Sequence, residues 1–385
     1  MLIYRTISIA LFLALFPLGS LYGATWRVEK DGSGDFSVIQ HAVDAASEGD
    51  TILVGAGRFD DFEPFNSGYW IADIIVVIQK DNLTLIGAGV DQTIIGPEVN
   101  NEPYGGMSQL IRGVGANNVH FENMAFENCA NGIVWISGAV SILACKVSFC
   151  FEGGVVSFTP DGTTVENCEF HHYGGVSVVT NGECDNILVS ECSFWGPGTG
   201  VGFNSTTNAT INSCMFSGCF GAIGYSQGSS GQVLNCQTSD VEGAVYVSSG
   251  SQVNLVNNFF PATTGSSIYV VDDSHVSGSG NVFSGGFETG TLSFGGRSTS
   301  GLHGNHIIKG DNPFAVQIRY AFYEMVTFDL SNNYWGTTDT ELIDEWIYDW
   351  NDDQTIHGII EYLPLADGPV STEEMSLDSV KALYR

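Results

Sequence analysis

The amino-acid sequence predicts an all-β protein, a parallel β-helix solenoid with a cap at each end. One observation is a column of cysteines at intervals of 22 to 24 residues, namely Cys145, Cys168, Cys192, Cys214 and Cys236. Each has an apolar residue three positions before it, and four of the five have an apolar residue two positions after it. The column continues past the cysteines, backward to Met124 and forward to Asn258, Asn281 and Asn305. A fixed period of this length indicates stacked supersecondary units, and it is about half the period of a β-propeller blade.

Each repeat contains short strands separated by turns rich in Gly, Asn and Ser. In one repeat the strands are expected at 187–189, 192–194 and 201–203. Strands this short need pairing with neighbouring repeats, which parallel stacking provides. An asparagine also precedes the column in four repeats, at Asn123, Asn167, Asn235 and Asn257. Stacked amides at this recurrent bend are expected to satisfy one another's hydrogen bonds.

The segment before the repeats, residues 24–65, is predicted to form an N-terminal cap and the first strands. Ser37 can cap a helix from Val38 to Ala46, whose apolar residues fall on one face. A helix here would cover the open edge of the first coil, which could otherwise pair with another chain.

The repeats themselves are expected over residues 66–335, in coils of about 22 residues. Residues 336–370 are predicted to form a C-terminal cap, with a helix at 341–348 and a last strand at 359–363. Residues 371–385 have the composition of a polar tail.

Short motifs near the N-terminus carry a resemblance to a known family. They are Asp31-Gly32-Ser33-Gly34-Asp35-Phe36, Gly49-Asp50-Thr51-Ile52 and Gly57-Arg58-Phe59. This segment resembles the opening of exported proteins of the pectin-lyase-like superfamily, and the coil pattern extends the resemblance to about residue 335. The resemblance implies a right-handed parallel β-helix. It does not imply one activity, because the superfamily contains lyases, hydrolases, esterases, epimerases and adhesins.

Residues 1–23 are typical of a secretory signal peptide. Arg5 supplies the positive charge, residues 7–18 are mostly apolar, and Gly23 or Ala24 marks a cleavage site. We therefore expect a secreted or periplasmic protein, a monomer with no membrane span in the mature chain. The alternative is an uncleaved N-terminal anchor.

Charge excludes some classes of partner. The chain has 12 Lys and Arg against 43 Asp and Glu, a formal net charge of -31. Nucleic acid and anionic membranes need a positive footprint, so neither is an expected partner. No Lys or Arg lies between Lys146 and Arg297. A polyanionic ligand in that stretch would need a bridging cation.

The nine cysteines suit free thiols better than disulfides or a metal site. Their count is odd, and at least five share one inward column, where a thiol acts as a small buried hydrophobe. Bridges between neighbouring coils are the alternative, because adjacent strands lie close enough for a disulfide. No spacing matches a Cys or Cys/His metal cluster.

One candidate site lies on the outer wall. Strand periodicity places Lys146 beside Glu169 and puts His171 and Trp195 in one outward row, with His172 nearby in sequence. In an enzyme, Glu169 and His171 would transfer protons, and Trp195, Lys146 and His172 would bind a sugar. We favour the interpretation that this row is an ordinary solvated surface without a functional site. A strand face in contact with solvent carries polar residues by default, and Lys146 and Glu169 then form an ordinary cross-strand pair.

Asp272, Asp273 and His275 form a second candidate. Inverting glycoside hydrolysis needs two carboxyl groups about 6.5–9.5 Å apart. Adjacent strand residues point to opposite faces, so a carboxylate pair in a loop is favoured. The sequence also lacks the motifs of the polygalacturonases, pectin methylesterases and alginate epimerases that share the resembled fold.

Two further patterns receive structural interpretations. Asp349, Asn351 and Asp353 alternate as in a calcium loop, but Gln354 stands in place of the required Gly; weak calcium binding is the lesser alternative to a solvated turn, and no other cofactor is expected. An aromatic column at intervals of 21 to 23 residues is predicted to point inward and stack in the core: Phe203, Tyr225, Tyr246 and Tyr269.

The sequence thus favours a non-catalytic extracellular or cell-surface protein, either structural or adhesive, that binds polysaccharide or a cell-surface glycan. The alternative is a carbohydrate-active enzyme, a polysaccharide lyase or glycoside hydrolase, with its site on the outer wall.

Overall fold

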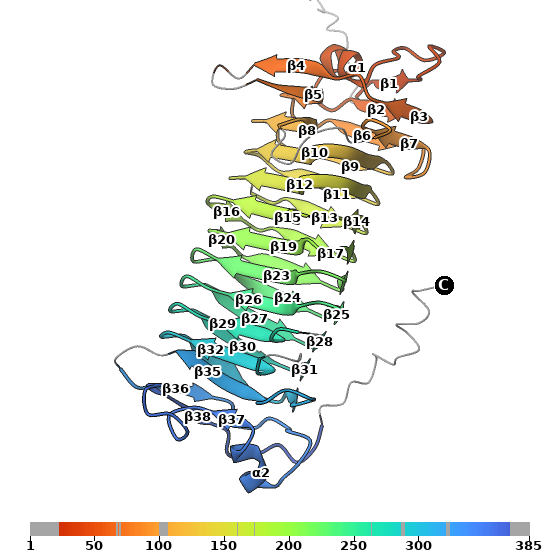
Figure 1. The fold of residues 1–385 in the computed structure, drawn as a ribbon. Helices are drawn as coiled ribbons and strands as arrows, with labels where there is room; N and C mark the ends of the chain where they lie inside the picture. The colour runs from red at the N-terminus through yellow and green to blue at the C-terminus, as the bar shows by residue number, and fades with distance from the viewer. Residues whose placement is uncertain are drawn as a thin grey trace, which may run out of the picture.

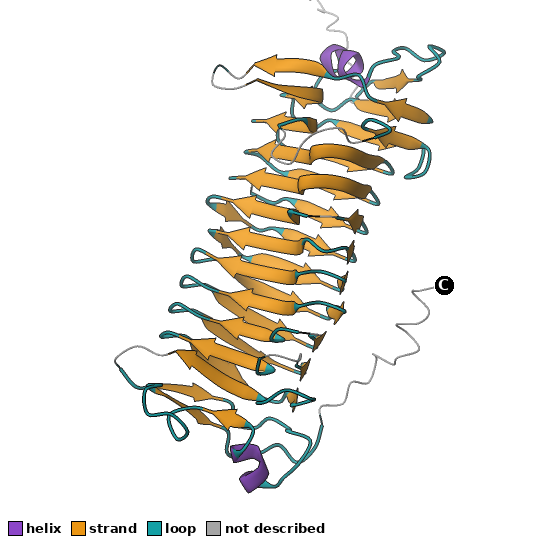
Figure 2. Ribbon diagram, in the orientation of Figure 1, coloured by secondary structure: helices purple, strands orange, loops and turns teal. Residues whose placement is uncertain are grey.

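The computed structural model describes residues 23–369, except 67, 69, 70, 100–106, 160, 173, 263, 286–288 and 321–323. The predicted signal peptide, apart from Gly23, and the predicted tail at 371–385 lie outside the described residues. Figure 1 shows a stack of coils that runs from helix α1 at one end to helix α2 at the other, and Figure 2 shows that strands make up almost all of it. The predicted parallel β-helix is confirmed.

Three long sheets form the walls of the solenoid. The first sheet is wholly parallel, and its strands in spatial order are β1 (Thr25–Val28), β2 (Thr51–Val54), β6 (Thr84–Gly87), β9 (Val119–Glu122), β11 (Val140–Leu143), β13 (Thr164–Glu166), β17 (Leu188–Ser190), β21 (Ala209–Asn212), β24 (Ser230–Leu234), β27 (Gln252–Val256), β30 (His275–Ser279), β33 (Thr299–Leu302), β36 (Val326–Asp329) and β38 (Gly358–Glu361). Side chains alternate between core and solvent along these strands.

The second sheet follows the cysteine column in each coil. It contains β3 (Gly57–Phe59), β7 (Thr93–Ile95), the first parts of β10 (Ala125–Ile136) and β12 (Lys146–Phe158), then β14 (Glu169–His171), β18 (Ser193–Trp195), β22 (Met215–Ser217), β25 (Gln237–Ser239), β28 (Phe259–Pro261), β31 (Val282–Ser284) and β34 (His306–Ile308). Strands β10 and β12 continue around the corner into the third sheet.

The third sheet completes each coil. After the antiparallel pair β4 (Glu63–Asn66) and β5 (Ile71–Ile78), it runs through β8 (Gln109–Val114), the ends of β10 and β12, β15 (Val176–Asn181), β19 (Thr199–Asn204), β23 (Gly221–Ser226), β26 (Gly243–Val247), β29 (Ile268–Val270), β32 (Leu292–Gly295), β35 (Val316–Tyr320) and β37 (Ile347–Tyr348). A small separate sheet pairs β16 (Cys184–Asp185) with β20 (Thr206–Thr207).

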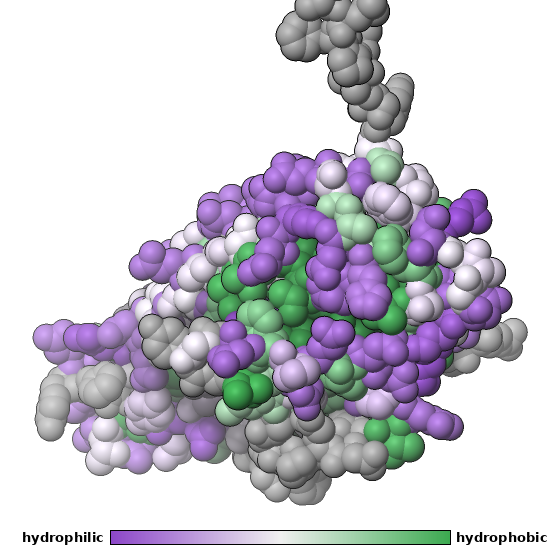
Figure 3. Space-filling model, turned by 90° about the horizontal axis from the view of Figure 1, so that it is seen from above, coloured by the Kyte–Doolittle hydropathy of each residue, from purple (hydrophilic) through white to green (hydrophobic). Residues whose placement is uncertain are grey.

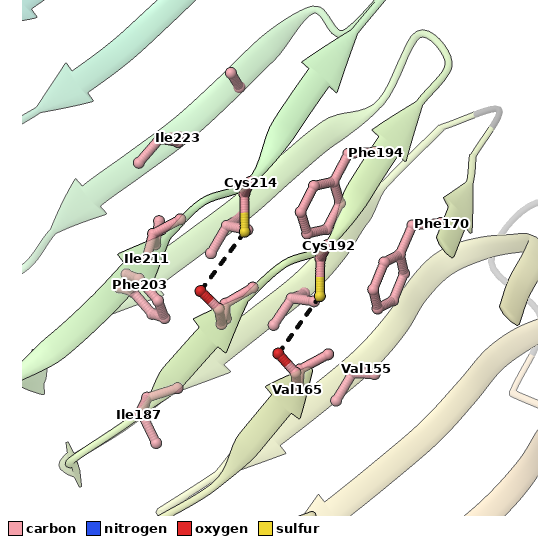
Figure 4. Close-up of a cluster of buried hydrophobic side chains, with 14 of the residues drawn as sticks. Val155, Val165, Phe170, Ile187, Cys192, Phe194, Phe203, Ile211, Cys214 and Ile223 are labelled. Carbon is pink, nitrogen blue, oxygen red and sulfur yellow. Dashed lines mark hydrogen bonds between the residues drawn. The ribbon is translucent and has the colours of Figure 1, made fainter. Parts of the chain in front are cut away.

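The cysteine column is an inward ladder, as predicted. All nine cysteines are buried free thiols. Figure 4 shows the thiols of Cys192 and Cys214 pointing into the core beside the rings of Phe170 and Phe194. The Cys192 thiol donates to the carbonyl of Val165 at 3.4 Å. The thiols of Cys168, Cys192 and Cys214 therefore fill the core and also donate to a carbonyl of the preceding coil.

Asparagines continue the same ladder with stronger bonds. The Asn281 Nδ2 donates to Asn305 Oδ1 at 2.8 Å, and the Asn281 Oδ1 accepts from Asn258 Nδ2 at 2.9 Å. The ladder extends one coil beyond the sequence prediction, to the buried Asn333, whose Oδ1 accepts from Asn305 Nδ2 at 3.0 Å. Buried amides are satisfied here because each finds its partner one coil away.

The residue before the ladder slot has a role different from the predicted amide stack. Asn123, Asn167, Asn235 and Asn257 all adopt the left-handed conformation, with φ of 52 to 56°. Asparagine tolerates this conformation better than most residues, so it turns the chain at the corner. The stacked amides lie one position later, in the slot itself.

Helix α1 (Ile39–Ala45) covers the first coil, as predicted, and buries Ile39, Ala42 and Val43. Its predicted cap at Ser37 is wrong, since Val38 precedes the helix without a side-chain cap. The helix is held instead by Lys80, whose ammonium donates to three carbonyls at its C-terminal end, 2.7 to 2.9 Å away. Figure 3 looks at this end of the molecule and shows apolar residues gathered near its centre, within a hydrophilic rim.

The C-terminal end differs from the prediction in one respect. Helix α2 (Thr340–Asp344) is shorter than predicted, and β37 follows it where a helix was expected. Strand β38 confirms the last strand predicted at 359–363. Strands β37 and β38 pair with β35 and β36, so the strand pattern continues past residue 335. Asp339 caps α2 by accepting two backbone amides. Neither described helix has the length or apolar sequence that spanning a membrane requires.

Candidate functional sites

The outer-wall strip predicted from sequence forms on the second sheet. Lys146 is the register partner of Glu169, and His171 is the register partner of Trp195. The imidazole of His171 stacks on the Trp195 ring, with centroids 4.8 Å apart and planes at 26°. The His171 Nε2 lies 3.7 Å from Glu169 Oε2, and both side chains are solvent-accessible, at 37% and 56%. The strip thus combines an acid, a histidine and an indole on one face.

A polar groove of about 500 Å³ lies beside this strip. Its lining includes Lys146, Glu169, Asp91 and Glu191, together with asparagine and serine side chains of the corner. His171 and Trp195 are not among its described lining residues, so the groove meets only one end of the strip.

His172 does not join the predicted sugar-binding residues. Its side chain points into the molecule and is only 2% exposed, so it cannot contact a ligand on the wall. Burial lowers the pKa of this imidazole from 6.5 to about 4. The error has a simple cause: His171 and His172 are adjacent, and adjacent residues at a strand end face opposite sides.

Asp272 and Asp273 lie in a turn, as the sequence indicated. Both have left-handed backbone conformations, with φ of 57 and 61°. Arg297 donates two hydrogen bonds to the Asp273 carboxylate, at 2.5 and 2.7 Å, and these lower the pKa of that carboxyl group. His275 lies on the first sheet, where its Nδ1 is 2.8 Å from Thr299 Oγ1. The three residues do not form a common site.

The acidic residues of the C-terminal turn are engaged by the protein itself. Asp349 is buried, and its two carboxylate oxygens accept from the backbone amides of Asn351 and Ile360 at 2.8 and 2.9 Å. Asp353 accepts from the amide and hydroxyl of Thr355. A calcium ion would have to compete with these donors. Within the described residues, no group of three or more His, Cys, Asp or Glu side chains is arranged to hold a metal ion.

The predicted inward aromatic column is wrong for its second half. Phe203 and Tyr225 are buried in the core, but Tyr246 is 44% exposed. The register partner of Tyr246 is Gly224, not Tyr225, and Tyr269 follows Tyr246 in the same row. A shift of one residue moves a strand side chain to the opposite face. The spacing of 21 between Tyr225 and Tyr246, where the cysteine column repeats at 22, was the signal that could have revealed this.

The displaced tyrosines line a groove on the third sheet, which we call the aromatic groove. Their ring centroids are 5.5 Å apart, and the Arg319 guanidinium lies 5.5 Å from the centroid of Tyr269. The groove has a volume of about 320 Å³, and its lining also includes Phe220 and Glu242. Phe220 is 64% exposed, which is unusual for so large an apolar side chain.

A phenol next to the groove is electrostatically perturbed. Partial burial, together with nearby Tyr269 and Asp272, raises the pKa of Tyr320 to about 12. The Tyr320 phenol therefore stays protonated even in mildly alkaline solution, and it can donate a hydrogen bond.

Comparisons with known proteins agree with this architecture. The A-module of the mannuronan C-5 epimerase AlgE4 of Azotobacter vinelandii superposes with a TM-score of 0.61 at 14% identity, covering 85% of this chain and 94% of that one. An alginate lyase from Paenibacillus sp. str. FPU-7 gives a TM-score of 0.50 at 15% identity, covering 66% and 95%. At such identities these likenesses show the fold alone.

The sequence itself has a family match. A comparison with curated proteins finds no match. The family model described as "Right handed beta helix region" matches residues 110–260 and 154–307. The two stretches together cover more than half of the chain, and this protein therefore belongs to the right-handed β-helix family.

Proposed function

We propose that this protein is a secreted, non-catalytic polysaccharide-binding protein that holds a glycan chain in the aromatic groove. The observation that carries the proposal is the pair formed by the exposed Tyr246 and the half-buried Tyr269, side by side on the outer wall. Aromatic rings offer a flat apolar surface with a polar edge, which suits the face of a sugar ring. A protein that the N-terminal segment exports as a monomer would meet polysaccharides outside the cell.

The polar border of the groove supports a glycan rather than a purely apolar ligand. Glu242 lies on one side, and Arg319 lies over Tyr269. In ligand sites, a few polar groups around an apolar surface orient the bound molecule. Arg319 also brings a positive charge to the groove. The chain between Lys146 and Arg297 supplies none, because it contains no Lys or Arg.

The same lining supports binding over hydrolysis. Glu242 is the only carboxylate among the described residues that line the groove. Glycoside hydrolysis in most families uses two carboxyl groups, one on each side of the scissile bond.

A glycan array with Tyr246→Ala and Tyr269→Ala tests the proposal. Each substitution should weaken binding of the oligosaccharides that the unaltered protein retains, because each removes a stacking surface of about 1 kcal/mol. Trp195→Ala is the matched control, since it removes a half-buried aromatic ring on the outer face of the second sheet. Loss of binding in Trp195→Ala alone would refute the aromatic groove as the site.

A carbohydrate-active enzyme, either a polysaccharide lyase or a glycoside hydrolase, is a second candidate. It is favoured by the close approach of His171 to Glu169 beside the Trp195 ring. In this function Glu169 and His171 transfer protons, while Trp195 and Lys146 bind the sugar. A reducing-end assay with Glu169→Gln and His171→Ala tests it, and activity that survives both substitutions would eliminate this site.

A further inference from the structure

We propose that four outward-facing glycines beside the aromatic groove, Gly202, Gly221, Gly224 and Gly243, form a floor on which the bound polysaccharide chain lies. This glycine floor deepens the proposed function and rests on it. It assigns a subsite and a ligand shape, namely an unbranched sugar chain running along the solenoid axis. Register places Gly224 directly beside Tyr246, its strand partner. Gly221 and Gly243 are partners of each other and line the aromatic groove together with the tyrosines.

Folding does not require glycine at these four positions. None of them has a positive φ, the conformation in which glycine is favoured over other residues. A Cβ atom added to Gly224 or Gly221 would meet only one atom within 4 Å, at 4.0 Å. At Gly202 and Gly243 the nearest atom would be 3.6 Å away, an ordinary van der Waals contact.

Gly200, on the inner side of the same strand as Gly202, shows the opposite case. A Cβ atom there would lie 2.5 Å from Phe216 Cδ1 and 2.6 Å from the carbonyl oxygen of Ala222. Core packing therefore demands glycine at position 200. No such contact explains the glycines of the floor, although a glycine inside a strand destabilises it by about 0.5–1 kcal/mol relative to alanine. In strands, such glycines often mark a place where a ligand approaches the backbone closely.

The boundaries of the floor indicate the shape of the ligand. Beyond Gly202 the outward row continues with Val179, and beyond Gly224 it continues with Tyr246 and Tyr269. Register partners stack along the solenoid axis about 4.8 Å apart, so Gly202 and Tyr269 are separated by roughly 14 Å. A ligand that contacts both is an oligomer, with one ring stacked on a tyrosine and the following rings on the floor.

The floor also limits substituents on the chain. Paired backbone groups and small hydrogens leave a flat surface, and Val176 and Val179 form a step at its far end, 3.6 and 3.9 Å from a Cβ atom placed on Gly202. A branch directed toward the floor would meet the backbone itself. We therefore expect unbranched chains to bind and chains with branches on that face to be rejected.

The test measures binding and stability in the same variants of the full chain. Calorimetry with cellohexaose and with a mannuronate hexamer provides a neutral and an acidic probe, and urea unfolding measures stability. Gly224→Leu and Gly202→Leu should weaken binding of the preferred probe by about tenfold or more, because the side chain occupies the space of a sugar ring. Gly224→Ala should keep or raise the urea midpoint while it weakens binding.

Gly301→Leu is the matched control. Gly301 also faces outward on a strand with an ordinary φ, and its added Cβ would meet atoms at 3.6 Å and beyond, but it lies on the first sheet. It should leave the affinity unchanged. Unchanged affinity in Gly224→Leu and Gly202→Leu, with Tyr246→Ala still weakened, would overturn the floor and leave the proposed function standing. Absence of binding to any glycan would instead overturn the proposed function.

Discussion

At the scale of single residues, the buried imidazole of His172 connects stability to pH. Its pKa is about 4 in the folded protein and about 6.5 when the chain is unfolded. Below pH 6.5 the unfolded chain therefore binds a proton that the folded protein does not. The free energy of unfolding therefore does not depend on His172 protonation above pH 6.5, and it decreases as the pH falls from 6.5 to 4.

We predict a loss of about 3 kcal/mol from this residue across that range, since one pKa unit corresponds to about 1.4 kcal/mol. Urea midpoints measured at pH 7 and pH 4.5 should differ more for the unaltered protein than for His172→Phe. Equal pH dependence in both proteins would contradict the assignment.

The asparagine ladder makes a second prediction at this scale. Asn281→Ala leaves the Leu255 carbonyl and the Asn258 amide groups without their partner in a buried slot. The expected loss in the free energy of unfolding is about 3 kcal/mol. Asn281→Cys should lose less, because a thiol fills the same slot in other coils and also bonds to a carbonyl. Urea unfolding distinguishes the two, and an equal loss would argue against interchangeable ladder residues.

At the scale of elements, the N-terminal helix is attached by two side chains that bond to backbone groups. Gln40 accepts from the Val77 amide at 2.7 Å and donates to the Val77 carbonyl at 3.2 Å, as a paired strand would. Lys80 then binds the carbonyls of Val43, Asp44 and Ala46. The helix thereby satisfies part of the edge that the first coil exposes.

We predict that Lys80→Met lowers the free energy of unfolding by about 1–2 kcal/mol, since charge-assisted hydrogen bonds to the helix end are lost. Lys80→Arg, which retains the charge, is the control. Hydrogen exchange of the α1 amides should accelerate in Lys80→Met alone. Similar exchange in both variants would show that the ammonium does not hold the helix.

The inward ladder and the outer strip could both be predicted from the sequence. The ladder from Cys145 to Asn305 can be recognised because one buried position repeats in every coil, and the strip from Lys146 to Trp195 follows from the alternation of strand side chains. The exposed face of Tyr246 was missed because it depends on register, which a difference of one residue in coil length decides. Strand β37 was missed because residues 341–348 have helical spacing, whereas β38 lies where the last strand was predicted, at 359–363.

At the scale of the whole molecule, each coil contacts mainly its neighbours. Stability in such arrays is close to a sum of terms for single coils and their interfaces, so a local loss stays local. We predict that Asn281→Ala increases hydrogen exchange mainly in strands β28, β30 and β31, and much less in β2 and β6. Uniform acceleration along the solenoid would indicate a single cooperative unit instead.

Because the ladder consists of thiols in the central coils and of amides in the later ones, cysteine reactivity can report where the solenoid unfolds. The nine buried cysteines lie between residues 129 and 236, whereas the following ladder positions carry asparagine. A thiol reagent can react only where a coil has opened, so the order in which these cysteines are modified reports how the solenoid unravels. Mass spectrometry of thiol modification in the unaltered protein would therefore map partial unfolding of the central coils without an introduced label.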